Sequence, residues 1–189
     1  MASLPNNLIS PDEYLRLERA ADFKSEYIAG EMVAMSGASL RHADIKGQIE
    51  SILRGQLKGT PCRPVSSDLR VNVGTAFFYP DVVVYCGEPK LLDATYVDTL
   101  LSPTVVIEVL SPSTSAYDRG IKFLRYAQIA SLQDYILVEQ DQIQIEHFHR
   151  LPDGDWPRAL ILTAPNDVIS LPSIHCSITL ADAYDGIAI

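Results

Sequence analysis

Two acidic residues stand beside or inside apolar runs, where an unpaired charge is unfavourable. Asp81 directly precedes the valines at 82–84, and Glu108 lies within the run 105–110. Because burying an unpaired carboxylate is costly, each acid needs a partner or a place at a strand end. Mg²⁺ would be such a partner, since it prefers oxygen ligands and commonly binds one or two carboxylates. We therefore expect Asp81 and Glu108, on neighbouring strands, to bind Mg²⁺, or alternatively Mn²⁺, with the carbonyl of Val109 as a third ligand.

A lysine follows in a position that suits the same site. Lys122 lies on the helix predicted directly after the strand that carries Glu108. An ammonium group there could orient an attacking water and offset the charge that builds on a scissile phosphate. Two acids and a lysine together indicate metal-dependent hydrolysis of a phosphodiester.

Each of these residues also has a purely structural explanation. Either acid alone is at least as often a salt-bridge partner or a strand-end residue. A helical lysine such as Lys122 more often forms an i,i+4 ion pair on a solvated face, here with Asp118. The catalytic interpretation depends on the three residues occurring together.

The hydrophobic pattern predicts an α/β chain around these residues. Ser10 precedes Pro11 and can cap a helix that ends near Ala20. Helical spacing, alternation and turn residues predict the elements that follow. These are a β-hairpin at 25–35, a helix at 39–58, strands at 64–73, 75–86 and 104–110, a helix at 116–130, a hairpin at 135–148, a strand at 158–163 and a short C-terminal helix. We expect one domain over residues 1–189, with helices flanking a central mixed sheet.

Several of these segments together carry a resemblance to a known family. They are Tyr79-Pro80-Asp81, the string Ile107-Glu108-Val109-Leu110-Ser111-Pro112-Ser113-Thr114, Asp118-Arg119 with Lys122 and Tyr126, and Glu26-Tyr27-Ile28-Ala29-Gly30-Glu31 with His42. This set resembles the Uma family of restriction-endonuclease-like proteins, a bacterial branch of the PD-(D/E)XK nuclease superfamily. The resemblance spans nearly the whole chain, and its most specific part is the string that contains Glu108.

The resemblance implies a restriction-endonuclease-like core and a set of roles. Asp81 and Glu108 would be metal ligands, and Glu26 would match the acidic residue that the superfamily carries near its N-terminus. One position departs, because the Glu-x-Lys pattern would place a lysine where this chain has Leu110. In this branch the lysine lies on the following helix, so the resemblance assigns the catalytic role to Lys122.

Three further residues are candidates for contacting the substrate. His42 matches the family pattern and would contact a substrate phosphate, although an ordinary polar position on a helix is an equal alternative. Ser111 is expected in the turn after the strand, where its hydroxyl could also reach the site. Arg119 is one of the local basic residues expected to contact DNA.

The remaining metal-binding residue types favour simpler explanations. His147 and His149 share one face of a predicted strand, but a zinc site needs more ligands and no cysteine lies near them in the sequence. We therefore expect an exposed pair. The three cysteines, Cys62, Cys86 and Cys176, are an odd number without a CxxC motif. We expect them to be unpaired, which favours a reducing cytoplasm.

Composition limits the partners of the chain. The 189 residues include 15 basic and 24 acidic ones, giving a formal net charge of −9. This charge disfavours indiscriminate polyanion binding, so DNA would have to be held by local basic residues and in a salt-sensitive manner. The first residues lack a signal-peptide pattern and no apolar run reaches about 18 residues. We expect a cytoplasmic protein that does not span a membrane.

These observations predict a Mg²⁺-dependent endonuclease that hydrolyses DNA. A homodimer is expected, since two active sites related by a two-fold axis match the pseudo-symmetry of a duplex. The alternative is a non-catalytic binding or regulatory module with the nuclease fold, associated with mobile elements. A metal-dependent hydrolase of smaller phosphate esters is a third interpretation.

Overall fold

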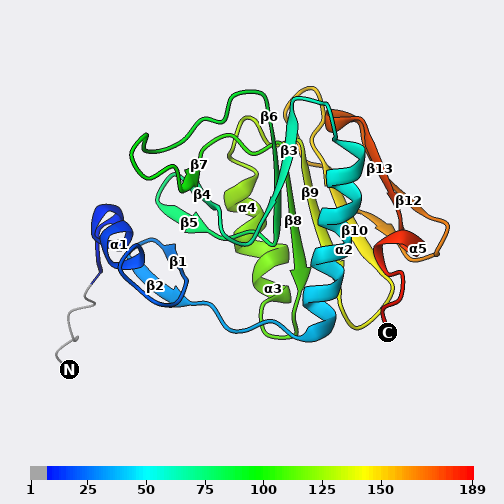
Figure 1. Ribbon diagram of the computed structural model, residues 1–189, viewed down its shortest axis with the longest axis horizontal. Coiled ribbons are helices and arrows are strands. Elements are labelled where there is room, and N and C mark those ends of the chain that lie inside the picture. The colour runs from blue at the N-terminus through cyan, green and yellow to red at the C-terminus, as the bar shows by residue number, and fades with distance from the viewer. Residues whose placement is uncertain (1–7) are drawn as a thin grey trace.

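The computed structural model describes residues 8–189. Two β-sheets dominate it, and the chain crosses repeatedly from one to the other (Figure 1). The five-stranded sheet has the order β2-β1-β5-β4-β7, with bounds Ser25–Ile28 (β1), Glu31–Ala34 (β2), Arg70–Val73 (β4), Ala76–Phe78 (β5) and Thr99–Leu100 (β7). The six-stranded sheet has the order β11-β10-β9-β8-β6-β3, with bounds Cys62–Ser66 (β3), Val82–Cys86 (β6), Val105–Leu110 (β8), Asp134–Glu139 (β9), Ile145–His149 (β10) and Leu160–Leu162 (β11).

Helices and a small hairpin complete the described chain. The helical segments are Pro11–Glu18 (α1), Leu40–Gln56 (α2), Ser115–Tyr117 (α3), a π-helical turn at Asp118–Lys122, Phe123–Tyr126 (α4), a 3₁₀ turn at Pro172–Ile174 and Leu180–Ala183 (α5). The hairpin pairs Val168–Leu171 (β12) with Cys176–Thr179 (β13). The predicted mixed sheet flanked by helices, with an N-terminal helix and hairpin, is confirmed.

Strand β8 is the centre of the six-stranded sheet, and its sequence explains why. Val105, Ile107 and Val109 join a core beneath α2, whereas Val106 and Leu110 join a second core on the opposite face. Branched apolar side chains on both faces suit a strand that is covered on both sides. Since Glu108 alternates with Ile107 and Val109, its side chain lies on the face away from α2.

Helix α2 covers one face of this sheet (Figure 1). Ile45, Ile49 and Leu53 repeat every four residues and are fully or almost fully buried against it. Ser39 caps the helix by accepting a hydrogen bond from the backbone N–H of His42 at 3.1 Å. The capping interaction fixes the first turn of α2, on which His42 lies.

Both long strands predicted before β8 are in fact divided between the two sheets. The stretch 64–73 breaks at Ser67, whose φ of 54° turns the chain from β3 to β4. The stretch 75–86 breaks between β5 and β6, where Pro80 lacks the N–H that a continuous ladder needs. The helix predicted at 116–130 is also shorter, because α3, the π-turn and α4 together end at Tyr126.

A disulfide contradicts the expectation of three unpaired cysteines. Cys62 and Cys86 are bonded, and the antiparallel register of β3 and β6 places them directly opposite each other. They lie 24 positions apart in sequence, because β4 and β5 intervene before the chain returns in β6. Cys176 is free and buried.

Along residues 8–189, no helix combines the length and the apolar character that crossing a bilayer requires.

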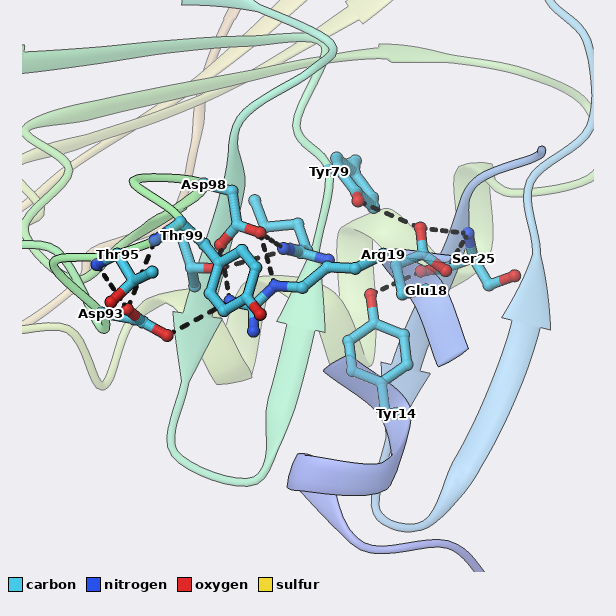
Figure 2. Close-up of polar contacts among 11 residues, drawn as sticks. Tyr14, Glu18, Arg19, Ser25, Tyr79, Asp93, Thr95, Asp98 and Thr99 are labelled. Atoms are coloured by element: carbon cyan, nitrogen blue, oxygen red, sulfur yellow. Dashed lines mark hydrogen bonds and ion pairs between the residues drawn. The ribbon is translucent and has the colours of Figure 1, made fainter. Parts of the chain in front are cut away.

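Helix α1 is attached to the five-stranded sheet by buried polar contacts (Figure 2). The carboxylate of Glu18 accepts hydrogen bonds from the backbone N–H of Ser25 at 2.9 Å and from the hydroxyl of Tyr79 at 3.0 Å. Arg19 donates to Asp98 at 2.8 Å, and the buried Arg70 donates to the same carboxylate. These contacts connect α1 to β1, to the segment after β5 and to the start of β7.

Replacing Asp98 by Asn should lower the free energy of unfolding by about 2 kcal/mol, because hydrogen bonds to charged groups contribute about 1.5–3 kcal/mol. Burial works to raise the pKa of Asp98, but hydrogen bonds from Arg19 and Arg70 hold it well below the usual aspartate value. The stabilisation is therefore present at neutral pH and is lost as the pH falls below the usual aspartate range. Urea denaturation at pH 7 measures the effect.

The matched control is Asp141→Asn, which removes the partner of Arg41 in an exposed ion pair. An exposed pair contributes about 0–1 kcal/mol, so this variant should unfold almost as the wild type does. Equal destabilisation by the two substitutions would contradict the role of Asp98 in attaching α1.

Candidate active site

The strand register brings Asp81 and Glu108 together. In the antiparallel pairing of β6 with β8, Val82 lies opposite Ile107. Asp81 directly precedes Val82 and Glu108 directly follows Ile107, and the negative charge of Asp81 lies close enough to Glu108 to raise the pKa of Glu108. Asp81 also stands where the chain passes from β5 to β6. The candidate site therefore lies at the junction of the two sheets.

Asp81 is held from two directions. Its Oδ2 accepts a hydrogen bond from the backbone N–H of Val109 at 2.8 Å, and its Oδ1 lies 2.9 Å from Nε2 of His42. The first contact connects it to β8, and the second connects it to the first turn of α2. His42 thus lies at the site through Asp81, and the backbone of Val109 lies beside the same carboxylate.

Lys122 occupies the centre of the acidic cluster. Its Nζ lies 2.9 Å from Oε1 of Glu108, 3.0 Å from Oε1 of Glu26 and 3.6 Å from Oδ1 of Asp118. The lysine side chain is only 6% exposed. The i,i+4 pair with Asp118 is therefore present, but it is buried within the cluster rather than lying on a solvated face.

Glu26 comes to the site from the other sheet. It lies on β1, and its Oε1 accepts a hydrogen bond from the backbone N–H of Tyr79 at 3.2 Å. Glu108 lies on β8 of the six-stranded sheet. The ammonium of Lys122 contacts both carboxylates and so connects the two sheets electrostatically.

The π-helical turn between α3 and α4 carries two charged residues of the cluster. Asp118 begins this turn and Lys122 ends it, and both side chains are buried. Tyr126 follows Lys122 by one helical turn, and its hydroxyl donates to Oε1 of Glu108 at 3.3 Å. Tyr126 belongs to the quoted family pattern, but its contact with Glu108 was not predicted. Its i+4 spacing from Lys122 is the signal that could have indicated this contact.

The electrostatics of the cluster fit a divalent cation. Three carboxylates, those of Glu26, Glu108 and Asp118, surround the single ammonium of Lys122, and the negative charge of Asp81 acts on Glu108. Burial raises the pKa of Glu108 well above its usual value, and the neighbouring carboxylates raise it further against the opposing effect of Lys122. Burial works to lower the pKa of Lys122, but Glu108 and Glu26 raise it well above its usual value. The donor set is thus rich in oxygen and carries excess negative charge, which suits Mg²⁺ or Mn²⁺.

A tyrosine next to the cluster was also missed by sequence reasoning. The hydroxyl of Tyr117 is buried and has no hydrogen-bond partner among residues 8–189. Burial and the charge of Glu26 raise the pKa of Tyr117 to about 12. Its phenol is therefore a neutral group that could donate a hydrogen bond to a ligand.

Two predicted substrate-binding residues make their contacts elsewhere. The Ser111 hydroxyl is hydrogen-bonded within its own turn, to Ser113 and Thr114, each at 3.0 Å. Arg119 donates to Glu146 at 2.8 Å and is also paired with Glu139. Neither side chain forms an ion pair or hydrogen bond with the acidic cluster in the described chain.

The histidines on β10 contradict the expectation of an exposed pair. His147 is buried, and the side chain of His149 is 41% exposed. Both rings contact the carboxylate of Asp134, which the sequence pattern did not connect with them. The cause is the pairing of β9 with β10, which places Asp134 opposite His149.

Comparison with known proteins assigns the chain to a family. Residues 11–183 match the family model Uma2, described as "Putative restriction endonuclease". The chain belongs to the Uma2 family. Two proteins of similar sequence come from Synechocystis sp. PCC 6803. The "Uncharacterized protein slr1290" is 39% identical, with 98% of this chain and 96% of the relative covered. The "Uncharacterized protein sll1609" is 32% identical, with 82% and 89% covered.

A solved structure supports the fold assignment of this Uma2 chain. It is a crystal structure from Anabaena variabilis, described as a "putative nuclease belonging to DUF820". The two structures agree with a TM-score of 0.77 at 21% sequence identity, over 93% of this chain and 97% of the other. The expected family and the restriction-endonuclease-like α/β fold are confirmed, and the description of the family model supports a nuclease-like function.

Proposed function

We propose that this Uma2 protein is an endonuclease that hydrolyses phosphodiester bonds of DNA with Mg²⁺ or Mn²⁺ as cofactor. The observation that carries the proposal is the buried convergence of Glu26, Glu108 and Asp118 on the ammonium of Lys122, with the charge of Asp81 acting on Glu108. A purely structural protein has no evident need to bury so many carboxylates around one cation, because each buried charge is costly to desolvate.

Asp81 and Glu108 would hold the cation, together with the carbonyl of Val109. A residue in a β-strand points its N–H and C=O to the same side, and the N–H of Val109 points to Asp81. The carbonyl of Val109 therefore faces the side on which Asp81 lies. His42 would keep the Asp81 carboxylate oriented through its 2.9 Å contact. A bound divalent cation supplies polarisation of the phosphate and a water of lowered pKa.

Lys122 would stabilise the charge that develops on the phosphate. Its ammonium is held by Glu26 and Glu108 within about one hydrogen-bond length, so its position is fixed before substrate binds. Glu26 would hold Lys122 in place. On the side of the five-stranded sheet, it would also orient a water or accept a proton from that water. Ser111 and Arg119 remain proposals for contacts to DNA outside the acidic cluster.

We further propose that the enzyme acts as a homodimer in the cytoplasm. A two-fold arrangement would present two sites to the two strands of a duplex. With a net charge of −9, contact with DNA has to come from local basic residues, and binding should weaken as salt increases.

The Cys62–Cys86 disulfide is the observation against the proposed cytoplasmic location, because disulfides are rare in a reducing compartment.

One observation favours the non-catalytic alternative. The ammonium of Lys122 already neutralises part of the charge on Glu26 and Glu108, as a bound cation would. A descendant of a nuclease that kept the fold as a binding or regulatory module could retain such an ion-pair cluster for stability alone. Assays of cleavage distinguish the two functions.

Tag-free protein with supercoiled plasmid should give nicked and linear products in the presence of Mg²⁺ or Mn²⁺, and none when EDTA removes the metal. Glu108→Gln, purified in the same way, controls for a contaminating nuclease and should be inactive. Absence of cleavage with either metal, on supercoiled and linear DNA, would favour the binding module. Equal activity of Glu108→Gln would also contradict the proposed site. Hydrolysis of nucleotides or simple phosphodiesters without cleavage of plasmid would indicate the small-ester alternative.

A further inference from the structure

A second group of metal-binding residue types lies away from the acidic cluster. Asp134 begins β9, and the antiparallel register places it directly opposite His149 on β10. His147 lies two residues earlier on β10, so its side chain projects from the same face of the sheet. Asp134, His147 and His149 each offer one donor atom, and these three atoms lie close enough together to hold one metal ion.

The donor atoms converge on one carboxylate oxygen. Nε2 of His147 and Nδ1 of His149 each lie 2.7 Å from Oδ1 of Asp134. The other carboxylate oxygen, Oδ2, accepts a hydrogen bond from the hydroxyl of Ser173 at 2.6 Å. Ser173 thus fixes the orientation of the carboxylate and leaves Oδ1 directed at the two imidazoles, as residues behind metal ligands commonly do.

The positions of the donors suit a small ion. The three donor atoms lie within 4.8 Å of one another. Zinc binds nitrogen and oxygen at about 2.0–2.2 Å, so donors around a tetrahedral ion are about 3.3 Å apart. Each of the two 2.7 Å contacts with Oδ1 would lengthen by about half an ångström to reach that spacing. The 41% exposure of the His149 side chain gives solvent a path to the cluster and to a remaining coordination position.

The ligand types discriminate between metals. Two imidazole nitrogens and one carboxylate suit Zn²⁺ and other divalent ions late in the first transition series. Mg²⁺ prefers oxygen ligands and competes poorly for such a set. The acidic cluster around Lys122 has the opposite preference, because it is rich in carboxylate oxygens.

The two groups lie on opposite faces of the six-stranded sheet. Asp134 alternates with Tyr135 and shares its face with Ile136, which packs in the core beneath α2. Glu108 projects from the other face. Along the shared ladder, Asp134 is the partner of Val105, whereas Glu108 is the partner of Leu137. Three strand positions correspond to about 10 Å, so an ion at Asp134 would not share ligands with the acidic cluster.

We propose that Asp134, His147 and His149 form a zinc-binding site that is separate from the nuclease site and holds the ends of β9 and β10 to the 3₁₀ turn carrying Ser173. The occupied site stabilises the folded chain, since an ion that binds only the native state raises its melting temperature. Its function is structural, and the proposed hydrolysis of DNA does not depend on it.

The test uses tag-free protein that has been treated with a chelator and dialysed. Calorimetric titration with ZnCl₂ should show one ion per chain, and a tenfold excess of Mg²⁺ should leave the titration unchanged. At a free Zn²⁺ concentration about 100 times Kd, the melting temperature should rise by about 5–10 °C. Co²⁺ should bind with the visible absorption of a tetrahedral nitrogen and oxygen site and without a thiolate charge-transfer band.

His149→Gln is the informative variant, because His149 is partly exposed and its replacement preserves the buried Asp134 and His147. We expect a loss of at least tenfold in Zn²⁺ affinity, with circular dichroism confirming the fold. The matched control is His175→Asn, an exposed histidine outside the group whose φ is 54°, a backbone conformation that Asn tolerates. It should bind Zn²⁺ as the wild type does.

Three results would overturn the proposal. They are absence of stoichiometric Zn²⁺ binding to the wild type, equal affinity of His149→Gln and the wild type, and a thiolate band with Co²⁺, which would assign the ion to a cysteine.

Discussion

Replacement of Lys122 by Met should lower the free energy of unfolding by about 3–5 kcal/mol, the usual effect of removing one partner from a buried ion pair. Met has a similar length and lacks the charge, so the change leaves Glu26, Glu108 and Asp118 without their shared cation. Protonation of Glu108 can relieve part of the repulsion, since burial already raises its pKa. The variant should therefore lose stability as the pH rises above the usual glutamate range. Urea denaturation at several pH values measures both effects.

Two further variants separate charge from packing. Lys58→Met removes an exposed lysine from the turn that follows α2, and surface substitutions of this kind change stability by about 0.5 kcal/mol or less. Combining Lys122→Met with Glu108→Gln should restore part of the lost stability, because one of the uncompensated carboxylates becomes neutral. A Lys122→Met protein as stable as Lys58→Met would show that the buried cluster does not depend on this cation.

Replacement of Asp81 by Asn should lower the rate of Mg²⁺-dependent plasmid cleavage by about a thousandfold, which corresponds to about 4 kcal/mol of transition-state stabilisation. An amide oxygen can still accept the hydrogen bond from the N–H of Val109, so the fold should be preserved. The loss is therefore expected in the chemistry and in metal affinity rather than in stability. Initial nicking rates over a range of Mg²⁺ concentrations measure it.

His42→Gln provides the matched comparison. His42 contacts Asp81 and not the other carboxylates, so it acts by positioning the proposed ligand. Losing such a contact commonly reduces metal affinity or activity by about 10–100-fold. We expect the rate of His42→Gln to recover substantially at high Mg²⁺, whereas that of Asp81→Asn should not. Wild-type rates in Asp81→Asn would contradict the assignment of this residue as a metal ligand.

Much of the acidic cluster could be predicted from sequence because its residues violate a local pattern. Glu108 interrupts the apolar run of β8, and Asp81 adjoins the valines of β6. The pattern also predicts that Asp81 and Glu108 lie on neighbouring strands and that Lys122 lies on the helix after them. In the structure these three residues lie at the junction of the two sheets. Glu26 required the family resemblance, since its strand is short and its own pattern indicates no chemistry.

The features that the sequence did not predict depend on which strands pair with each other rather than on the local pattern of apolar and polar residues. The break between β3 and β4 follows from which sheet each strand joins, and apolar alternation does not specify a sheet. The bond between Cys62 and Cys86 likewise depends on the register of two strands. Asp134 lies just before the hairpin predicted at 135–148, and only the pairing of β9 with β10 places it beside His147 and His149.

The division of the acidic cluster between two sheets has a consequence for the chain during synthesis. Glu26 emerges early on a strand of the five-stranded sheet, whereas Glu108 and Lys122 come much later and belong to the six-stranded sheet and its helix. Neither sheet alone contains the complete residue set. A nascent or half-folded chain therefore lacks the assembled site, so the proposed hydrolysis of DNA would require both sheets to be folded and packed together.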